Sequence, residues 1–368
     1  VLTVTNVNDA PTVTSAISDV SHAEDAAYSL SVASVCTDVD SGDSLTYSIS
    51  GAPSTITISG TTISGTPTNA NVGAHTITVT CTDGSSATAS DQYVLTVTNT
   101  NDAPTVASAI ADASTNEDAA YSLNVAGTCT DVDSGDSLTY TISGAPSTIT
   151  ISGTTISGTP VNANVGAHTI TVTCTDDGTG TLTASDQYVL TVTNVNDAPT
   201  ITSTAVTAVN EDAAYSYTVT TNDVDGDTVT LTGTTVPSWM SFNTNTGALT
   251  GTPTNSEVGS HTVVITATDT NSASTAQTFT VVVTNTNDAP VVTSTAVTAV
   301  DEDAAYSYTV TATDVDVGDT LTMTGTTVPS WLTFDATTGV LAGTPLNANV
   351  GANSVVITIN DGTVDVTD

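Results

Sequence analysis

Acidic side chains recur at fixed positions along this chain of 368 residues. Seven acidic positions appear in each of four repeats, and seven times four accounts for 28 of the 38 acidic residues. In the first two repeats they are Asp9, Glu24, Asp25, Asp38, Asp40, Asp43 and Asp83, then Asp102, Glu117, Asp118, Asp131, Asp133, Asp136 and Asp176. In the last two they are Asp197, Glu211, Asp212, Asp223, Asp225, Asp227 and Asp269, then Asp288, Glu302, Asp303, Asp314, Asp316, Asp319 and Asp361. So regular a set of carboxylates indicates a repeated binding site rather than a general solubilising coat.

The chain contains no Lys and no Arg, so its formal net charge is -38. Without cations it cannot neutralise phosphates, which excludes a nucleic-acid-binding surface, a phosphate-binding lysine and a polybasic membrane patch. No apolar run approaches the ~20 residues that span a bilayer, so we expect no membrane insertion of this segment. Clustered carboxylates repel unless they are protonated or bridged by a cation. The alternative to a cation site is a set of solvated acidic loops.

The repeats can be counted from four copies of the tetrapeptide NDAP, which begin at Asn8, Asn101, Asn196 and Asn287. The motifs EDAAYS, DVD and GTP follow at matching distances in each unit. Each unit has about the size of one small domain. The predicted organisation is residues 1–7 as the closing strand of a preceding repeat, then repeats over 8–100, 101–195, 196–286 and 287–368, the last without its closing strand.

Alternation of apolar residues with Thr or Ser indicates β-strands, and Gly-rich, Asp-rich and Ser-rich turns separate them at short intervals. About seven such strands in each unit predict an immunoglobulin-like β-sandwich. We therefore expect an all-β fold class, a tandem array of four immunoglobulin-like sandwiches in a linear rod. In the first unit the predicted strands are A near 12–18, B near 28–36, C near 44–50, D and E within 56–64, F near 76–81 and G near 92–98.

The four cysteines form two pairs, each 45 residues apart: Cys36 with Cys81, and Cys129 with Cys174. Each pair falls at the ends of strands B and F, which face each other across the core of an immunoglobulin-like sandwich. The sequence contains no CxxC spacing, which would have indicated a redox or metal site. We therefore expect two structural disulfides and an oxidising, extracellular compartment. In the other two repeats Trp239 and Trp331 are expected to fill the core, with sugar stacking as the alternative.

Topology predicts where the acidic positions meet. The DVD step and the aspartate after strand F lie at one end of a sandwich, the top. The ED pair lies at the opposite end, beside the linker that leads to the top of the following sandwich. At the first junction this gathers Glu24, Asp25, Asn99, Asn101, Asp102, Asp131, Asp133, Asp136 and Asp176. The other linker amides of the predicted ligand set are Asn6, Asn8, Asn194, Asn196, Asn285 and Asn287. Carboxylate and amide oxygens without clustered His or Cys select Ca²⁺, which takes about six to eight oxygens.

The TNxNDAP linker, the DVD step and the acidic residue before strand B resemble the calcium-binding elements of cadherin repeats. The segment 329–351 resembles the putative-Ig and dystroglycan-type cadherin-like repeats of large bacterial surface proteins. The resemblance implies Ca²⁺ ligation by the linker Asn and Asp, the DVD aspartates and the ED glutamate. The linker begins with Asn99, Asn194 or Asn285 rather than Asp and lacks a second Asn after Asp, so we expect one or two ions per junction rather than three.

The chain carries no recognisable catalytic motif, and its recurring histidines, His75, His168 and His261, stand about one domain apart. We therefore expect no enzyme but an extracellular structural protein, a calcium-stiffened stalk or filament of a microbial surface adhesin. The alternative is a binding module whose loops recognise a surface glycan or a partner protein. The other expected partners are neighbouring repeats, or copies of the same chain arranged head to tail. Val1–Asn6 matches a closing strand, so the chain is expected to be a window of a longer array; alternatively, this strand completes another copy's last domain.

Overall fold

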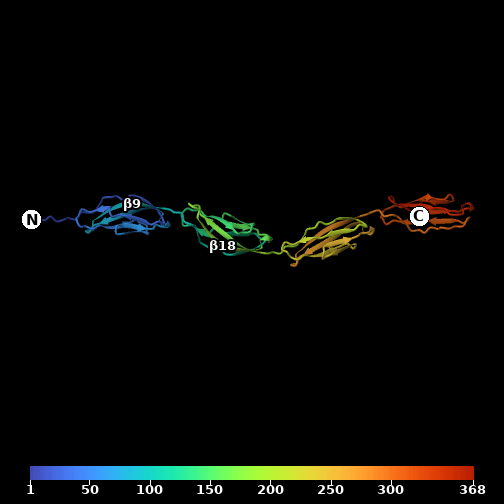
Figure 1. Cartoon of the computed structure of the whole chain (residues 1–368), viewed down its shortest axis with the longest axis horizontal. Coiled ribbons are helices and arrows are strands. Elements are labelled where there is room, and N and C mark those ends of the chain that lie inside the picture. Colours follow the sequence, from blue (N-terminus) through green and yellow to red (C-terminus); the bar gives the residue numbers. More distant parts are fainter. The chain divides into compact units, whose positions relative to one another are not determined.

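The computed structural model describes residues 1–368 and consists of β-strands with four short 3-10 turns. The chain divides into two compact units, Val1–Val195 and Asn196–Asp368, and each contains two of the predicted repeats. Figure 1 shows the strands of each repeat gathered into a separate body along the colour gradient. The helical segments are turns of three residues, and no helix is long and apolar enough to cross a membrane.

The first unit contains β1 to β18. In the first repeat the elements are β1 (Thr12–Val13), β2 (Val20–Ala23), β3 (Tyr28–Ser31), β4 (Cys36–Thr37), β5 (Thr46–Ser50), β6 (Ile56–Ser59), β7 (Thr62–Gly65), a 3-10 turn (Asn69–Asn71), β8 (Gly73–Thr82) and β9 (Thr88–Thr98). In the second they are β10 (Thr105–Val106), β11 (Ala113–Asn116), β12 (Tyr121–Asn124), β13 (Cys129–Thr130), β14 (Thr139–Ser143), β15 (Ile149–Ser152), β16 (Thr155–Gly158), a 3-10 turn (Asn162–Asn164), β17 (Gly166–Thr175) and β18 (Thr183–Thr193).

The second unit contains β19 to β35. In the third repeat the elements are β19 (Thr200–Ile201), β20 (Ala208–Asn210), β21 (Tyr215–Thr218), β22 (Thr221–Asn222), β23 (Thr230–Thr235), β24 (Met240–Asn243), β25 (Ala248–Gly251), a 3-10 turn (Asn255–Glu257), β26 (Gly259–Thr268) and β27 (Ser274–Thr284). In the fourth they are β28 (Val291–Val292), β29 (Tyr306–Thr309), β30 (Ala312–Thr313), β31 (Thr322–Thr327), β32 (Leu332–Asp335), β33 (Val340–Gly343), a 3-10 turn (Asn347–Asn349), β34 (Val356–Asn360) and β35 (Asp365–Thr367).

Each complete repeat is a sandwich of two sheets. In the first repeat the larger sheet has the order β2-β9-β8-β5, the smaller has the order β3-β7-β6, and β1 pairs with β4 beside them. All pairings are antiparallel except β2 with β9, which is parallel and aligns Val20 with Leu95. The parallel pairing puts the ED turn, which follows β2, at the same end of the sandwich as the linker that follows β9.

The predictions of single strands A and B were wrong. Strand A, expected near 12–18, is split into β1 and β2, which join different sheets; strand B, expected near 28–36, is split into β3 and β4. The break in A coincides with two side-chain contacts to the last strand. The backbone N–H of Ile17 donates to Asp91, and Asp19 accepts from the N–H of Val94. Asp19 and Asp91, which lie outside the seven repeated acidic positions, therefore hold the strand crossover in place rather than bind an ion.

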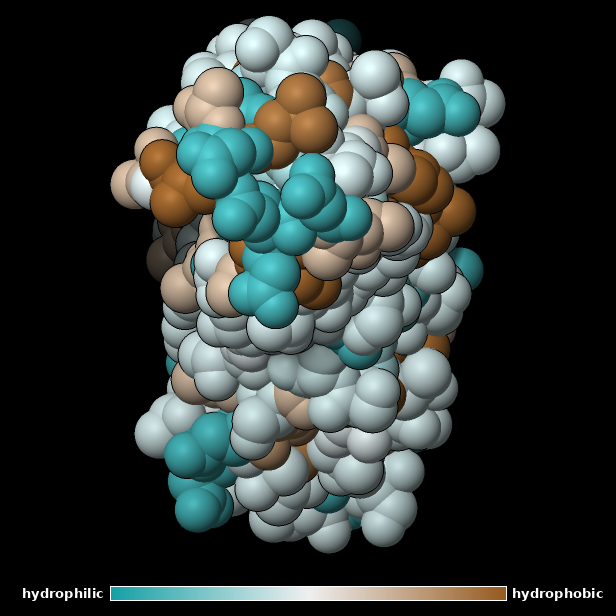
Figure 2. Space-filling view, turned by 90° about the vertical axis from the view of Figure 1, so that its right-hand side faces the viewer, coloured by the Kyte–Doolittle hydropathy of each residue, from teal (hydrophilic) through white to brown (hydrophobic).

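The core of each repeat follows the alternation of its long strands. Along β8 the side chains of Ile77, Val79 and Cys81 are fully buried while the intervening Thr residues lie outward. On β9 the buried set is Tyr93, Leu95 and Val97. The outward Thr and Ser give the surface its character, since Figure 2 shows a face of mostly near-neutral hydropathy with hydrophilic side chains gathered in patches.

Both predicted disulfides are formed, Cys36–Cys81 between β4 and β8, and Cys129–Cys174 between β13 and β17. In the third repeat Trp239 packs against the core, edge-on to Tyr215 at 5.9 Å between ring centroids. In the fourth repeat Trp331 lines a cavity instead. We expected the closing strand of this repeat to be missing, whereas β35 supplies three residues of it, paired with β34.

Candidate metal centre

The junction between the first two repeats is organised by the buried Glu24, which follows β2. Its side chain is 1% exposed, and its Oε1 accepts a hydrogen bond from the backbone N–H of Thr100 in the linker, at 3.0 Å. The next residue, Asp25, adopts a left-handed backbone conformation, and its N–H donates to the carbonyl oxygen of Pro67. The turn thus fixes the glutamate against the departing linker and leaves the Asp25 side chain exposed next to it.

The DVD step of the second repeat contacts the same linker. Oδ1 of Asp131 accepts from the backbone N–H of Asp133 at 2.9 Å, which folds the step into a tight turn. Asp133 is 5% exposed, and its Oδ2 accepts from the backbone N–H of Asp102 at 2.6 Å. The linker is therefore hydrogen-bonded to the end of one sandwich and to the beginning of the next.

Two groups of carboxylates meet at Asp133. Oxygen atoms of Glu24, Asp102 and Asp133 lie within 4.8 Å of one another, as do oxygen atoms of Asp131, Asp133 and Asp136. Burial raises the pKa of Asp102, and the charges of Asp25, Asp133 and Asp131 raise it further. Burial and the same kind of repulsion, from Asp133 first, raise the pKa of Asp136. The site is thus electrostatically unfavourable for anions and favourable for a cation.

The aspartate after the long strand β17, Asp176, anchors the linker from the other side. Its Oδ2 accepts from Nδ2 of Asn101 at 3.1 Å, and its Oδ1 accepts from the backbone N–H groups of Gly178 and Leu182. The same arrangement recurs at Asp83, Asp269 and Asp361, whose side chains accept from Asn8, Asn196 and Asn287. The side-chain hydrogen bond from Asn8 is the main cause of the lowered pKa of Asp83, so this aspartate keeps its charge.

Sequence reasoning missed one residue at this junction. Asn69, in the 3-10 turn after the GTP motif, donates from Nδ2 to Oδ1 of Asp133 at 2.7 Å. Asn recurs at this position in every repeat, as Asn162, Asn255 and Asn347. That recurrence was the available signal, but an uncharged residue in a polar turn does not stand out in a search for carboxylates.

Buried oxygen atoms without a hydrogen-bond donor test whether a cation fits. Glu24 Oε2, Asp131 Oδ2 and Asp136 Oδ2 are buried and have no hydrogen-bond partner. Removing a carboxylate oxygen from water without a partner is costly, and the chain offers no Lys or Arg to compensate. Oxygen donors from carboxylates and backbone, with no sulfur or imidazole, suit Ca²⁺. The residues present therefore fit calcium in the two groups that share Asp133, one with Glu24 and Asp102 and the other with Asp131 and Asp136.

The second unit repeats this arrangement between the third and fourth repeats. Glu211 is buried and accepts from the N–H of Thr286, and Asp316 accepts from the N–H of Asp288 at 2.7 Å. Nδ2 of Asn255 donates to Asp316 at 2.8 Å. Glu211 Oε2 and Asp314 Oδ2 are buried without partners, and oxygen atoms of Asp314, Asp316 and Asp319 lie within 4.8 Å of one another. Burial and repulsion from Asp316 raise the pKa of Asp288. The first two repeats and the last two differ in their core residues, yet the junction inside each pair has the same hydrogen bonds and the same buried carboxylate oxygens without partners.

The remaining predicted ligands occupy matching places within their own units. Asp38, Asp43 and Asp83 group at the start of the first repeat, where Asp40 accepts from Asn6 and from the N–H of Asp9. In the third repeat, Asp223 accepts from the N–H groups of Asp225 and Asp227, and Asp225 accepts from the N–H of Asp197. Glu117 is buried like Glu24 and accepts from the N–H of Val195, beside exposed Asp118. Exposed Asp212 contributes its charge to the surroundings of Asp288.

The linker asparagines divide into two kinds. Those before Asp, namely Asn8, Asn101, Asn196 and Asn287, bind the anchoring aspartates. The earlier ones contact the 3-10 turns, since Asn194 accepts from Asn162 and Asn285 accepts from Asn255. Asn99 is exposed like Asn194 and Asn285 but makes no side-chain hydrogen bond, and Asn6 donates to Asp40 instead of contacting a turn.

Comparison with known proteins defines the class of protein to which this fold and these junctions belong. The family described as Putative Ig domain matches four times, over residues 10–98, 103–193, 198–284 and 289–368. The chain therefore belongs to this family. The four matches fall on the four structural repeats.

Two relatives are called "Serine-rich adhesin for platelets" and come from Staphylococcus aureus strains MRSA252 and MSSA476. Each is 34% identical over 170 residues, which is 45% of this chain but only 12% and 7% of the relatives. Among solved structures, the protocadherin gammaB7 EC3-6 cis-dimer is 21% identical with a TM-score of 0.49, and the match covers 98% of both chains. Mouse cadherin-23 EC22-24 is 20% identical with a TM-score of 0.44, over 76% of this chain and 100% of that one.

The family, the adhesin relatives and the two disulfides place the chain outside the cell, at the surface. They indicate a structural or binding protein built from repeats rather than an enzyme.

Proposed function

We propose that the chain is a calcium-stiffened stalk segment of a microbial surface adhesin. One observation carries the proposal: buried, partnerless carboxylate oxygens, including Glu24 Oε2 and Asp131 Oδ2, gather where one repeat meets the next. The adhesin relatives support the surface role, and the recurrence of this junction in the second unit supports a structural one.

Calcium would act on the junction rather than on the folding of the repeats. Glu24 belongs to the first repeat, Asp102 to the linker and Asp133 to the second repeat, so an ion held by this group would link three segments. The hydrophobic cores are separate from these ligands and are closed by their own strands. Without the ion, repulsion among the carboxylates opposes close approach of the linker and both sandwiches. Bound calcium therefore stiffens the linker, and the expected stoichiometry is one or two ions per junction.

Chelation tests this mechanism. Small-angle scattering of the whole chain should give a narrow distribution of dimensions with calcium and a broader one with chelator. Circular dichroism should report the same β-structure in both conditions. Unchanged scattering on chelation would sink the proposal, and loss of the β-signal would show that calcium supports folding instead.

A matched pair of variants distinguishes the loss of a calcium ligand from the loss of one negative charge elsewhere in the chain. Asp133→Asn should abolish calcium binding at the first junction, as measured by titration calorimetry. Asp335→Asn removes the same charge from a turn whose aspartate accepts from the N–H of Thr337, and Asn243 accepts in the same way in the third repeat. This control should therefore fold normally and bind as many ions as the parent. Equal calcium loss in both variants would favour the solvated-loop explanation.

A further inference from the structure

The 3-10 turn that carries Asn69 is held from two sides by hydrogen bonds to Asn71. The side-chain oxygen of Asn71 accepts from the backbone N–H of Thr68 at 3.0 Å and from Oγ1 of Thr55 at 2.9 Å. Nε2 of His75, on β8, lies 2.7 Å from the carbonyl oxygen of Asn71. A carbonyl oxygen only accepts hydrogen bonds, so the imidazole is the donor. Asn71 thus connects the turn to the loop before β6 and to a long strand of the larger sheet.

This turn adjoins the ED turn of the same repeat. The backbone N–H of Asp25 donates to the carbonyl oxygen of Pro67, just before the 3-10 turn, at 2.8 Å. Glu24 contacts the linker, and Asn69 contacts Asp133 of the next repeat. The two turns therefore form one connected surface at the end of the first sandwich, and both contact the junction.

The hydrogen bonds that hold the turn recur in the other repeats, although the residues that make them change. His168 donates to the carbonyl oxygen of Asn164 at 2.7 Å, and His261 donates to that of Glu257 at 2.6 Å. Glu257 also replaces the side-chain acceptor, since its Oε2 accepts from the N–H of Thr254 at 2.9 Å. A charged residue and an uncharged one thus serve equally as the acceptor.

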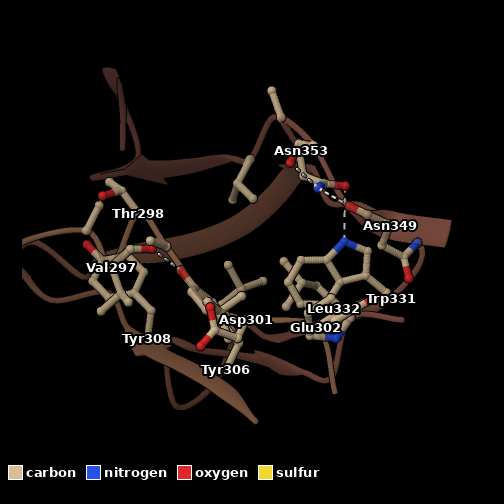
Figure 3. Close-up of a pocket in the computed structure, with 18 of the residues that line it drawn as sticks. Val297, Thr298, Asp301, Glu302, Tyr306, Tyr308, Trp331, Leu332, Asn349 and Asn353 are labelled. Carbon is tan, nitrogen blue, oxygen red and sulfur yellow. Dashed lines mark hydrogen bonds between the residues drawn. The ribbon is translucent and has the colours of Figure 1, made fainter. Parts of the chain in front are cut away.

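In the fourth repeat an asparagine replaces the histidine. Nδ2 of Asn353 donates to the carbonyl oxygen of Asn349 at 2.9 Å. Figure 3 shows both residues together on one side of the view, beside Trp331. The feature that the four repeats share is therefore an N–H donor to the carbonyl oxygen of the turn, and not an imidazole as such. This gives the recurring histidines a role, although they stand too far apart to share one ion.

We propose that Asn71 and His75 are positioning residues of the calcium centre at the first junction, on which they act through Asn69. The inference rests on the proposed calcium function and identifies residues that prepare one side of the centre before an ion binds. The bonds to Asn71 hold the turn in the conformation from which Asn69 donates to Oδ1 of Asp133. A side chain on an ordered turn loses less conformational entropy when it orients a ligand than one on a loose turn. His75 thus raises calcium affinity without contacting an ion.

His75 lies outside the hydrophobic core of its repeat. Its side chain is half-buried, whereas Ile77 and Val79, the next inward-facing residues of β8, are fully buried and belong to the core. Loss of the histidine's hydrogen bond should therefore loosen the turn without opening the core. Calcium affinity can then be measured on a folded repeat.

Three variants of the full chain test the role of the histidine. His75→Phe keeps a ring and removes the donor, whereas His75→Gln keeps an N–H donor the same number of bonds from the backbone. His168→Phe makes the first change in the second repeat. Hydrogen exchange of the linker N–H groups at 99–103, followed as calcium is added, measures affinity at the first junction. His75→Phe should weaken this affinity about 10-fold, at the lower end of what outer-shell residues contribute, and the other two variants should match the parent.

A second set of measurements tests whether the effect passes through Asn69. When His75→Phe is added to Asn69→Ala, affinity should fall no further, because the two residues act in one chain of contacts. Hydrogen exchange at 68–73 in chelator reports the order of the turn without any ion, and it should be faster in His75→Phe than in the parent or in His75→Gln. Thr55→Val removes the other donor at nearly unchanged shape and should act in the same direction, which keeps the test decisive if His75→Phe unfolds the repeat.

The outcomes distinguish this inference from the calcium function itself. Equal calcium affinity in the parent, His75→Phe and Thr55→Val would overturn the positioning role and leave the calcium junction intact. Additive losses in the double variant would also overturn it, because His75 would then act elsewhere. A parent without calcium-dependent protection at 99–103 would refute both proposals.

Discussion

Asn69 of the first repeat donates a hydrogen bond from Nδ2 to Oδ1 of Asp133 in the second repeat, at 2.7 Å. The other oxygen of Asp133 accepts from the linker N–H of Asp102. Asn255 and Asp316 have the same relationship in the second unit, at 2.8 Å. One carboxylate at each of these junctions is therefore oriented by the preceding repeat and by the linker at once.

The role of this asparagine can be measured. Asn69→Ala should reduce calcium affinity at the first junction ~10–100-fold, because residues that orient metal ligands usually contribute that much. Asn347→Ala is the matched control, because Asn347 occupies the same turn of the fourth repeat but its side chain makes no hydrogen bond. Calorimetric titrations of both variants should show one weakened site for Asn69→Ala and none for the control. Identical isotherms would assign no positioning role to Asn69.

Calcium binding should depend on pH in a direction that the pKa shifts define. The pKa values of Asp102 and Asp136 are raised by burial and then by neighbouring carboxylates. Protons therefore compete with calcium at a higher pH than they would at an isolated aspartate. Calcium titrations should show constant affinity near neutrality and a decline as the pH falls toward these raised values.

Stability without calcium should change in the opposite direction. Between the ordinary and the raised pKa, the folded chain binds more protons than the unfolded chain at these two positions, so acidification in this window stabilises the fold. Thermal unfolding in chelator at neutral and mildly acidic pH measures this effect. For calcium binding, an affinity that stays constant as the pH falls to the ordinary pKa of aspartate would contradict the assignment of Asp102 and Asp136 as ligands.

Much of the junction could be predicted from sequence because its charged residues repeat. Glu24, Asp102, Asp131, Asp133 and Asp136 were assigned to one place from strand topology, and the structure brings their side chains together. Two features escaped prediction for physical reasons. Asn69 carries no charge, and Asn99 makes no side-chain hydrogen bond although its sequence position matches that of Asn194 and Asn285, which both accept one. Local packing decides between such equivalent amides, and repeat alignment does not report it.

The fold was predicted at the level of sandwich and disulfide but not at the level of strand breaks. Period-two alternation runs through both halves of strands A and B, and it contains no information on which sheet each half joins. Beside the parallel pairing of β2 with β9, Asp19 and Asp91 accept hydrogen bonds from backbone N–H groups across the crossover. Such contacts connect residues about 75 positions apart, beyond the reach of local pattern.

Reduction of the disulfides should destabilise the first unit alone. Each bridge closes 45 residues, and in the chain-entropy model such a loop contributes about 4 kcal/mol to the free energy of unfolding. Denaturant unfolding with reductant should therefore shift the transition of the repeats in Val1–Val195. The repeats in Asn196–Asp368, which contain no cysteine, serve as the internal control. An equal shift in both units would point to an effect of the reductant other than bridge cleavage.

The glycine of the GTP motif should tolerate no side chain. A Cβ at Gly158, on β16, would overlap the backbone carbonyl oxygen of Thr148, so the neighbouring backbone would have to move. Gly158→Ala should destabilise the second repeat by about 1–3 kcal/mol or more, as overpacking does. Gly127→Ser is the control, because a Cβ there meets nothing within 4 Å and the first repeat has Ser34 at this position. Urea unfolding of both variants checks the difference, and a neutral Gly158→Ala would refute the close approach.

The two disulfides also set how far the chain can lengthen under a pulling force. When an adhesin stalk is loaded, a repeat that gives way releases the length of its whole chain, but a bridged repeat withholds the loop between its cysteines. For Cys36–Cys81 and for Cys129–Cys174 this loop of 45 residues corresponds to about 150 Å of extended chain. The unbridged repeats of the second unit have no such limit. Under tension, the repeats of the second unit would therefore extend by the full length of their unfolded chain. Each repeat of the first unit would extend less, by the length of its bridged loop.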